Sequence, residues 1–148
     1  MASKKSIVSA AAAVHAVSAS SGLTISEMLE VLKSEKDVQV FDACRIAGPD
    51  CIKLAFFHAD MAFKEDRNLV RDRMLEVLLR ASGSRQVADA VKRVGVKDPK
   101  SIIIGFKGDA KRKARLLKKL DAKETKWGPI RAEEEKKAIE RMVLLQLE

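Results

Sequence analysis

The sequence predicts an α+β fold, in which a small sheet packs against several α-helices. Two short runs with the pattern of strands, 38–45 and 101–106, are separated by segments that have helical periodicity and helix-capping residues. The chain has 148 residues, of which 47% are hydrophobic, so it can bury one core but not two. We therefore expect a single domain over 1–148.

The first strand is expected near residues 6–16, a segment rich in alanine and serine. With Lys4 and Lys5 in front of it, this segment also has weak features of a cleaved signal peptide. Its serines, its His15 and its alanines in place of leucines favour the buried strand instead.

Two helices are expected around the strand at 38–45. Thr24 and Glu27 have the spacing of a capping box, which predicts a helix over 25–35. Gly48 and Pro49 begin a second helix that ends near residue 64, since proline is tolerated in a first helical turn. This helix is apolar on nearly all sides, which predicts a place at the centre of the core.

Two further helices are expected before the strand at 101–106. Asn68 can cap the first, and Gly83 ends it. Ser84 begins the second, and Gly95 ends it. Beyond the strand we expect a basic helix over 109–120, a turn or short fourth strand over 127–131, and a last helix over 132–147.

The charge of the chain is uneven. Its formal net charge is +8, and residues 107–126 contain nine basic and three acidic side chains. Such an excess favours polyanionic partners, because Lys and Arg that neutralise phosphates release condensed counterions.

The helix expected over 109–120 has one basic face and one face of alanine and leucine. At 100° per residue, its basic arc contains Lys111, Arg112, Arg115, Lys118 and Lys119. This arc could follow a phosphate backbone, or it could be an ordinary solvated surface. Aromatic residues are scarce, so any RNA would be read mainly through polar and aliphatic contacts. Trp127 is the one plausible residue for base stacking, but we expect it to be buried.

No catalytic or metal-binding pattern is present. Cys51 and His58 are separated by two helical turns, about 10.5 Å, too far for a shared metal ion or a nucleophile and base. A Cys44–Cys51 disulfide is conceivable, but two cysteines fit a reduced, cytoplasmic protein better. We expect no enzyme activity, no cofactor, no metal and no membrane-spanning segment.

The last helix has a broad apolar face. Leu144 and Leu147 widen it beyond what one packing contact buries, which predicts a surface for another protein. The residues predicted to bind this partner are Ile139, Met142, Val143 and Leu145.

An ordered series of short motifs covers residues 38–96. The motifs are Phe41-Asp42-Ala43, Ile46-Ala47-Gly48, His58-Ala59, Ala62-Phe63, Asn68, Glu76-Val77-Leu78-Leu79 and Ala81-Ser82-Gly83-Ser84-Arg85-Gln86-Val87. In order and spacing they resemble the accessory subunit of the KEOPS tRNA-modification complex, called PRPK-binding protein in animals and Cgi-type in yeast and archaea. The family pattern often has His in place of Cys51 and Tyr in place of Arg80.

This resemblance implies a protein without catalytic activity that binds and stimulates a small kinase-ATPase subunit of the PRPK or Bud type. The assembly places threonylcarbamoyl on the tRNA adenosine next to the anticodon, and the archaeal subunit is understood to hold the single-stranded CCA end of tRNA. The alternative is a stand-alone RNA-binding protein associated with ribosomes or tRNA. A kinase-binding subunit should leave Ile139, Met142 or Leu145 partly exposed, whereas a solitary RNA-binding protein should bury all three.

Mapped onto this chain, the resemblance points to the helix junction at 81–86 as the first RNA contact. The junction exposes a helix N-terminus, which suits a phosphate. Its candidate residues are Ser82, Gly83, Ser84, Arg85 and Gln86, with Asn68 and Arg45 as further members. The alternative is that the two serines only cap the flanking helices.

Overall fold

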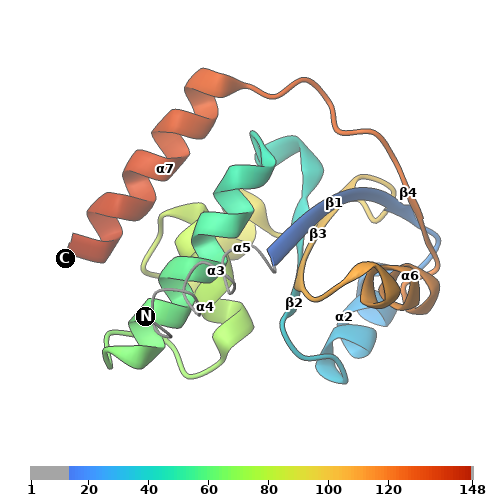
Figure 1. Ribbon diagram of the computed structural model, residues 1–148, viewed down its shortest axis with the longest axis horizontal. Helices are drawn as coiled ribbons and strands as arrows, with labels where there is room; N and C mark the ends of the chain where they lie inside the picture. Colours follow the sequence, from blue (N-terminus) through green and yellow to red (C-terminus); the bar gives the residue numbers. More distant parts are fainter. Residues whose placement is uncertain (1–13, 148) are drawn as a thin grey trace.

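The computed structural model describes residues 14–147 and has the predicted α+β fold, built on one antiparallel sheet (Figure 1). The strand order is β2-β3-β1-β4, with strands β1 (Val14–Ser21), β2 (Val38–Asp42), β3 (Ile102–Lys107) and β4 (Ala122–Glu124). The helices are α2 (Ile25–Lys33), α3 (Pro49–Lys64), α4 (Arg73–Ser82), α5 (Val87–Val94), α6 (Ala110–Lys119) and α7 (Ala132–Leu147).

Helices cover both faces of the sheet. Along β3, Ile103 points to one face, where it packs in the core cluster formed with α3, α4, α5 and α7. Ile102 and Ile104 point to the other face, against α2 and α6. The two layers can be followed in Figure 1, where α2 and α6 lie on one side of the strands and α3, α4 and α7 on the other.

Helix α3 approaches the sheet very closely at Gly105 of β3. A Cβ atom at this position would lie 2.7 Å from Cγ2 of Ile52 and 3.0 Å from the Phe56 ring. Glycine is therefore required here because the side chains of Ile52 and Phe56 pack directly on the backbone of the strand. The prediction that α3 is the core helix is confirmed, since Ile52, Ala55 and Ala62 are all fully buried.

Two of the predicted helix starts are wrong. Helix α4 begins at Arg73, and its N-cap is Asp72, which accepts hydrogen bonds from the backbone N–H groups of Met74 and Leu75. Asn68 instead donates its side-chain amide to the carbonyl of Val70. Helix α5 begins at Val87 rather than just after Ser84. The capping box of α2 and the ends at Gly83 and Gly95 are as predicted.

The strand boundaries also differ from expectation. The predicted strand at 38–45 ends at residue 42, because Asp42 accepts a hydrogen bond from the N–H of Cys44 and starts a 3₁₀ turn, η1 (Ala43–Arg45). The first strand extends to Ser21 instead of ending near residue 16, and the predicted part at 6–13 lies outside the described residues.

Residues 127–131, predicted as a turn or a short fourth strand, do not form a strand; the fourth strand is Ala122–Glu124, which pairs with the end of β1. The predicted segment is a connection without regular structure. Two hydrogen bonds hold this connection in place. In the first, the indole Nε1 of Trp127 donates to the carbonyl of Ala16 at 3.2 Å. The N–H of Arg131 donates to the carbonyl of Ala47 at 3.1 Å.

A buried ion pair on α4 connects three parts of the chain. Nε of Arg80 lies 2.8 Å from Oε2 of Glu76, and the two side chains are 3% and 0% exposed. The other carboxylate oxygen accepts hydrogen bonds from the N–H groups of Leu69 and Val70, while Nη1 of Arg80 donates to Oε1 of Gln146 on α7. The pair therefore fixes the α3–α4 loop and the end of α7 to α4.

We predict that Arg80→Met destabilises the protein by about 3–5 kcal/mol, because it leaves the Glu76 carboxylate buried without a cation. The measurement is urea unfolding followed by circular dichroism. The matched control is the double variant Glu76→Gln/Arg80→Met, whose amide oxygen can still accept the two backbone hydrogen bonds. This double variant should recover part of the free energy of unfolding that the single variant loses. A loss below about 1 kcal/mol in the single variant would contradict this role of the pair.

Candidate functional site

Four arginines from separate segments surround one hollow on the sheet face that carries α3, α4, α5 and α7. The hollow has a volume of about 510 Å³ and lies between residues 44–47, the end of α4, α5 and α7. We call it the arginine hollow. The arginines that line it are Arg45, Arg93, Arg131 and Arg141.

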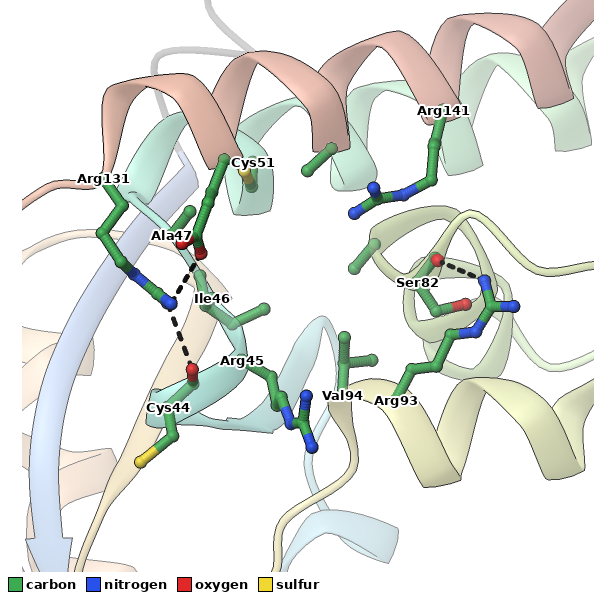
Figure 2. Close-up of a pocket in the computed structure, with 13 residues that line it drawn as sticks. Cys44, Arg45, Ile46, Ala47, Cys51, Ser82, Arg93, Val94, Arg131 and Arg141 are labelled. Carbon is green, nitrogen blue, oxygen red and sulfur yellow. Dashed lines mark hydrogen bonds and ion pairs between the residues drawn. The ribbon is translucent and has the colours of Figure 1, made fainter.

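Two of these arginines are held by neighbouring groups, one lies at the rim and one reaches into the open space (Figure 2). Arg131 donates to the carbonyl of Cys44 at 3.1 Å and forms an ion pair of 2.7 Å with Glu134. Arg93 makes a long contact, 3.4 Å, with the carbonyl of Ser82. In Figure 2 the guanidinium group of Arg141 extends toward the middle of the hollow, whereas that of Arg45 lies at the rim, next to Val94.

The electrostatic character of the arginine hollow is cationic. Among residues 14–147, four arginines and one carboxylate, that of Glu134, line it. Guanidinium groups keep their charge at every physiological pH and present donors in a fork that matches phosphate or carboxylate oxygens. Because all four arginines are exposed, solvent screens their mutual repulsion and an anion can reach them. The arrangement suits a phosphate-bearing ligand.

A second hollow of about 430 Å³ adjoins the first and shares Arg93 and Arg141 with it. We call it the junction hollow because the α4–α5 junction lines it. Of the predicted RNA-binding residues, Gly83, Ser84, Arg85 and Gln86 line the junction hollow, whereas Ser82 and Arg45 line the arginine hollow.

The hydroxyl groups of the junction make local structural bonds. Ser82 Oγ donates to the carbonyl of Leu79 and accepts from the N–H of Ser84. Ser84 Oγ accepts from the N–H of Gln86, and Gly83 adopts the left-handed conformation, with φ of 70°. The junction therefore performs the capping role while it also forms the wall of a cationic hollow.

Asn68 is not part of this site. It lies before the N-terminus of α4, whereas Gly83 follows the C-terminus of this ten-residue helix, roughly 15 Å away along the axis. It lines neither the arginine hollow nor the junction hollow.

The basic arc of α6 lies on the opposite face of the sheet from both hollows. Two of its members are engaged with Glu35: Arg112 at 3.7 Å, and Lys119 through a hydrogen bond that lowers the pKa of the Glu35 carboxyl. Lys111, Arg115 and Lys118 are exposed on the outer side of the helix. The predicted RNA-binding residues thus fall into two regions that the sheet separates.

The predicted partner-binding face of α7 needs correction. Met142 is 0% exposed and Leu145 is 7% exposed, because they lie on the side of α7 that packs on α3 and α4. Val143 is 43% exposed, and Ile139 is half-buried. Met142 and Leu145 therefore belong to the core and not to an open surface.

Ile139 contributes to a separate, mostly apolar hollow between α3 and α7. This α3–α7 hollow has a volume of about 390 Å³. The other residues that line it are Asp50, Lys53, Leu54 and Phe57 of α3. Neighbouring residues of α7 face different hollows, since Ala138 lines the arginine hollow and Ile139 lines the α3–α7 hollow.

The cysteines and the buried histidine do not form a reactive cluster. Both thiols are free; Cys44 is exposed, and burial, with the nearby Glu135 carboxylate, raises the pKa of Cys51 to about 11. Burial and the charge of Arg80 lower the pKa of His58. Within residues 14–147, no group of three or more His, Cys, Asp or Glu side chains could hold a metal ion. No helix in this range is long and apolar enough to cross a membrane.

Sequence reasoning missed Arg93, Arg131 and Arg141. Each is an ordinary exposed arginine, Arg93 and Arg131 near helix ends and Arg141 within α7, and no local pattern distinguishes it from other basic residues. Their significance arises only when the fold brings them next to Arg45. The available signal was the match of Ala81–Val87 to a known pattern, because this segment lines the hollows next to these arginines.

Comparison with known proteins confirms the resemblance. The family model for kinase binding protein CGI-121 matches residues 5–143. The chain is also similar to the KEOPS complex subunit Cgi121 of Pyrococcus abyssi (strain GE5 / Orsay), with 27% identity over 110 residues, or 71% of this chain. The aligned part is 64% of that relative's length, which is less than two thirds. The chain belongs to the kinase binding protein CGI-121 family.

Proposed function

We propose that this protein is a non-catalytic subunit of a KEOPS-type complex, which holds the single-stranded CCA end of tRNA and binds the PRPK/Bud-type kinase-ATPase subunit. In this role it supports threonylcarbamoyl modification of the adenosine next to the anticodon. The observation that carries the RNA part is the arginine hollow, which is lined by four arginines from separate segments. The family and the name of the archaeal relative support the kinase and KEOPS parts.

The shape of the site favours a single strand over a duplex. The arginine hollow is a recess between α7 and the α4–α5 junction, and it continues into the junction hollow through the shared Arg93 and Arg141. An unpaired RNA end can enter such a recess and place successive phosphates on these two arginines. A rigid double helix would meet only the rim.

The α3–α7 hollow is the surface that suits the kinase subunit best. Leu54, Phe57 and Ile139 form an apolar depression, with Lys53 and Asp50 at its edge. A buried apolar anchor surrounded by polar groups is the common arrangement at the centre of protein interfaces. The partly exposed Ile139 is what we expect of a kinase-binding subunit, although Met142 and Leu145 are buried.

A stand-alone RNA-binding protein is the second candidate, and the exposed part of the α6 arc favours it. Lys111, Arg115 and Lys118 could bind RNA phosphates without any contribution from the arginine hollow. Such binding would depend on salt but not on the sequence or presence of the CCA end. The two candidates therefore differ in which RNA they recognise.

We predict that Arg93→Ala/Arg141→Ala weakens binding of intact tRNA by at least about tenfold, because hydrogen bonds to charged groups are each worth about 1.5–3 kcal/mol. The measurement is fluorescence anisotropy with tRNA and with the same tRNA lacking its CCA end. The double variant should bind both RNAs with the weak affinity that wild type shows for trimmed tRNA. Arg71→Ala, an exposed arginine outside both hollows, is the control and should bind normally.

A charge-reversed arc, Lys111→Glu/Arg115→Glu/Lys118→Glu, separates the two candidates. Under the proposed function it lowers the affinity for both RNAs and flattens their salt dependence, but it retains the preference for the CCA end. If wild type binds trimmed and intact tRNA equally, the CCA part of the proposal is wrong. If only the arc variant affects binding, the second candidate replaces it.

We predict that Leu54→Asp abolishes co-purification with the kinase subunit, because it places a charge in the apolar depression where a partner side chain would be desolvated. Leu54 is only half-buried, so the melting temperature should change little. The matched control is Leu29→Asp on α2, where the native leucine is 50% exposed on the other side of the sheet. Retention of the kinase by both variants would show that the α3–α7 hollow is not the interface.

A further inference from the structure

A third hollow, of about 370 Å³, adjoins the arginine hollow beside the paired residues Ser18 of β1 and Ile103 of β3. We call it the tryptophan hollow because Trp127 forms part of its wall. It shares Cys44, Ile46, Ala47 and Arg131 with the arginine hollow. A ligand that occupies one of these hollows can therefore continue directly into the other, past the Arg131 guanidinium.

The indole of Trp127 is held in a fixed position. It is half-buried against the core, and its Nε1 donates to the carbonyl of Ala16 at 3.2 Å. The polar edge of the ring is thus satisfied, while part of the ring lines the hollow. At the neighbouring Gly128, an added Cβ would meet no atom of residues 14–147 within 4 Å apart from its chain neighbours, so this part of the wall is open.

The rest of the tryptophan hollow is mainly aliphatic. Ile46, Ile103 and Pro129 line it together with the ring. Ser18 of β1 also lines this hollow. Its hydroxyl already shares a hydrogen bond of 2.9 Å with the hydroxyl of Thr125. A flat, largely apolar ligand fits these walls better than a charged one.

We propose that the tryptophan hollow takes a nucleobase, stacked on Trp127, from the same RNA strand whose phosphates lie in the arginine hollow. The inference rests on the proposed function, and it adds a base site to a phosphate site. Stacking on an aromatic ring accepts every base, and Ser18 offers little discrimination, so the site recognises the presence of a base more than its identity.

Trp127 is the single tryptophan of the chain, so its fluorescence reports directly on this hollow. The probe is a short single-stranded RNA ending in CCA, compared with versions in which one of the terminal nucleotides is abasic. The intact RNA should quench the emission as it binds. One abasic position should remove the quenching and weaken binding by roughly 5- to 100-fold. Inorganic pyrophosphate, which can occupy the arginine hollow alone, should leave the emission unchanged.

Variants at Trp127 give a second measurement that does not depend on fluorescence. Measured by anisotropy, Trp127→Leu should weaken binding of the intact RNA by the same factor as the abasic substitution does. The variant should bind the abasic RNA as well as wild type does. Trp127→Phe keeps an aromatic surface and should lose less. If Trp127→Leu does not fold, the titration of the wild-type protein with the abasic RNAs still tests whether a base stacks on Trp127.

Two outcomes overturn the inference in different ways. If the RNA binds but leaves the emission of Trp127 unchanged and every abasic version binds equally well, the base site is wrong and the proposed function stands. If the RNA does not bind at all while the kinase subunit does, the RNA part of the proposed function and the base site both fail.

Discussion

The close packing of α3 on β3 is the constraint on which the rest of the structure depends. Only a glycine at position 105 lets Ile52 and Phe56 approach the sheet so closely. This contact fixes the position of α3, against which α4 and α7 then pack. The N-terminal half of α3 contributes Cys51 to the arginine hollow and Leu54 to the α3–α7 hollow, so one helix positions both candidate binding surfaces.

Helix α7 completes both surfaces and is fastened at its two ends. Near its start, the Glu135 carboxylate lies against Gly48, where an added Cβ would be 1.6 Å from Oε2, and burial raises the pKa of Glu135. Near its end, Gln146 accepts a hydrogen bond from Arg80. Between these points Met142 enters the core. The exposed Arg141 is thus carried by a helix whose position is determined by buried contacts.

The sequence was sufficient for elements that depend on local chemistry. The capping box at Thr24, the proline at the start of α3 and the left-handed Gly83 each act through their immediate neighbours, so the starts of α2 and α3 and the end of α4 were predicted correctly. Features that depend on distant residues were missed. The pairing of β4 with β1, the burial of Met142 and the convergence of four arginines all require the complete fold.

The central claim is that the CCA end of tRNA lies in the arginine hollow, and photo-cross-linking tests it most directly. A tRNA with a photoreactive nucleotide at its 3′ end would be irradiated in complex with the protein, and the modified peptide identified by mass spectrometry. The account predicts cross-links within residues 43–47, 81–94 or 127–141, the segments that surround the hollow. Cross-links confined to α6, on the opposite face of the sheet, would contradict it.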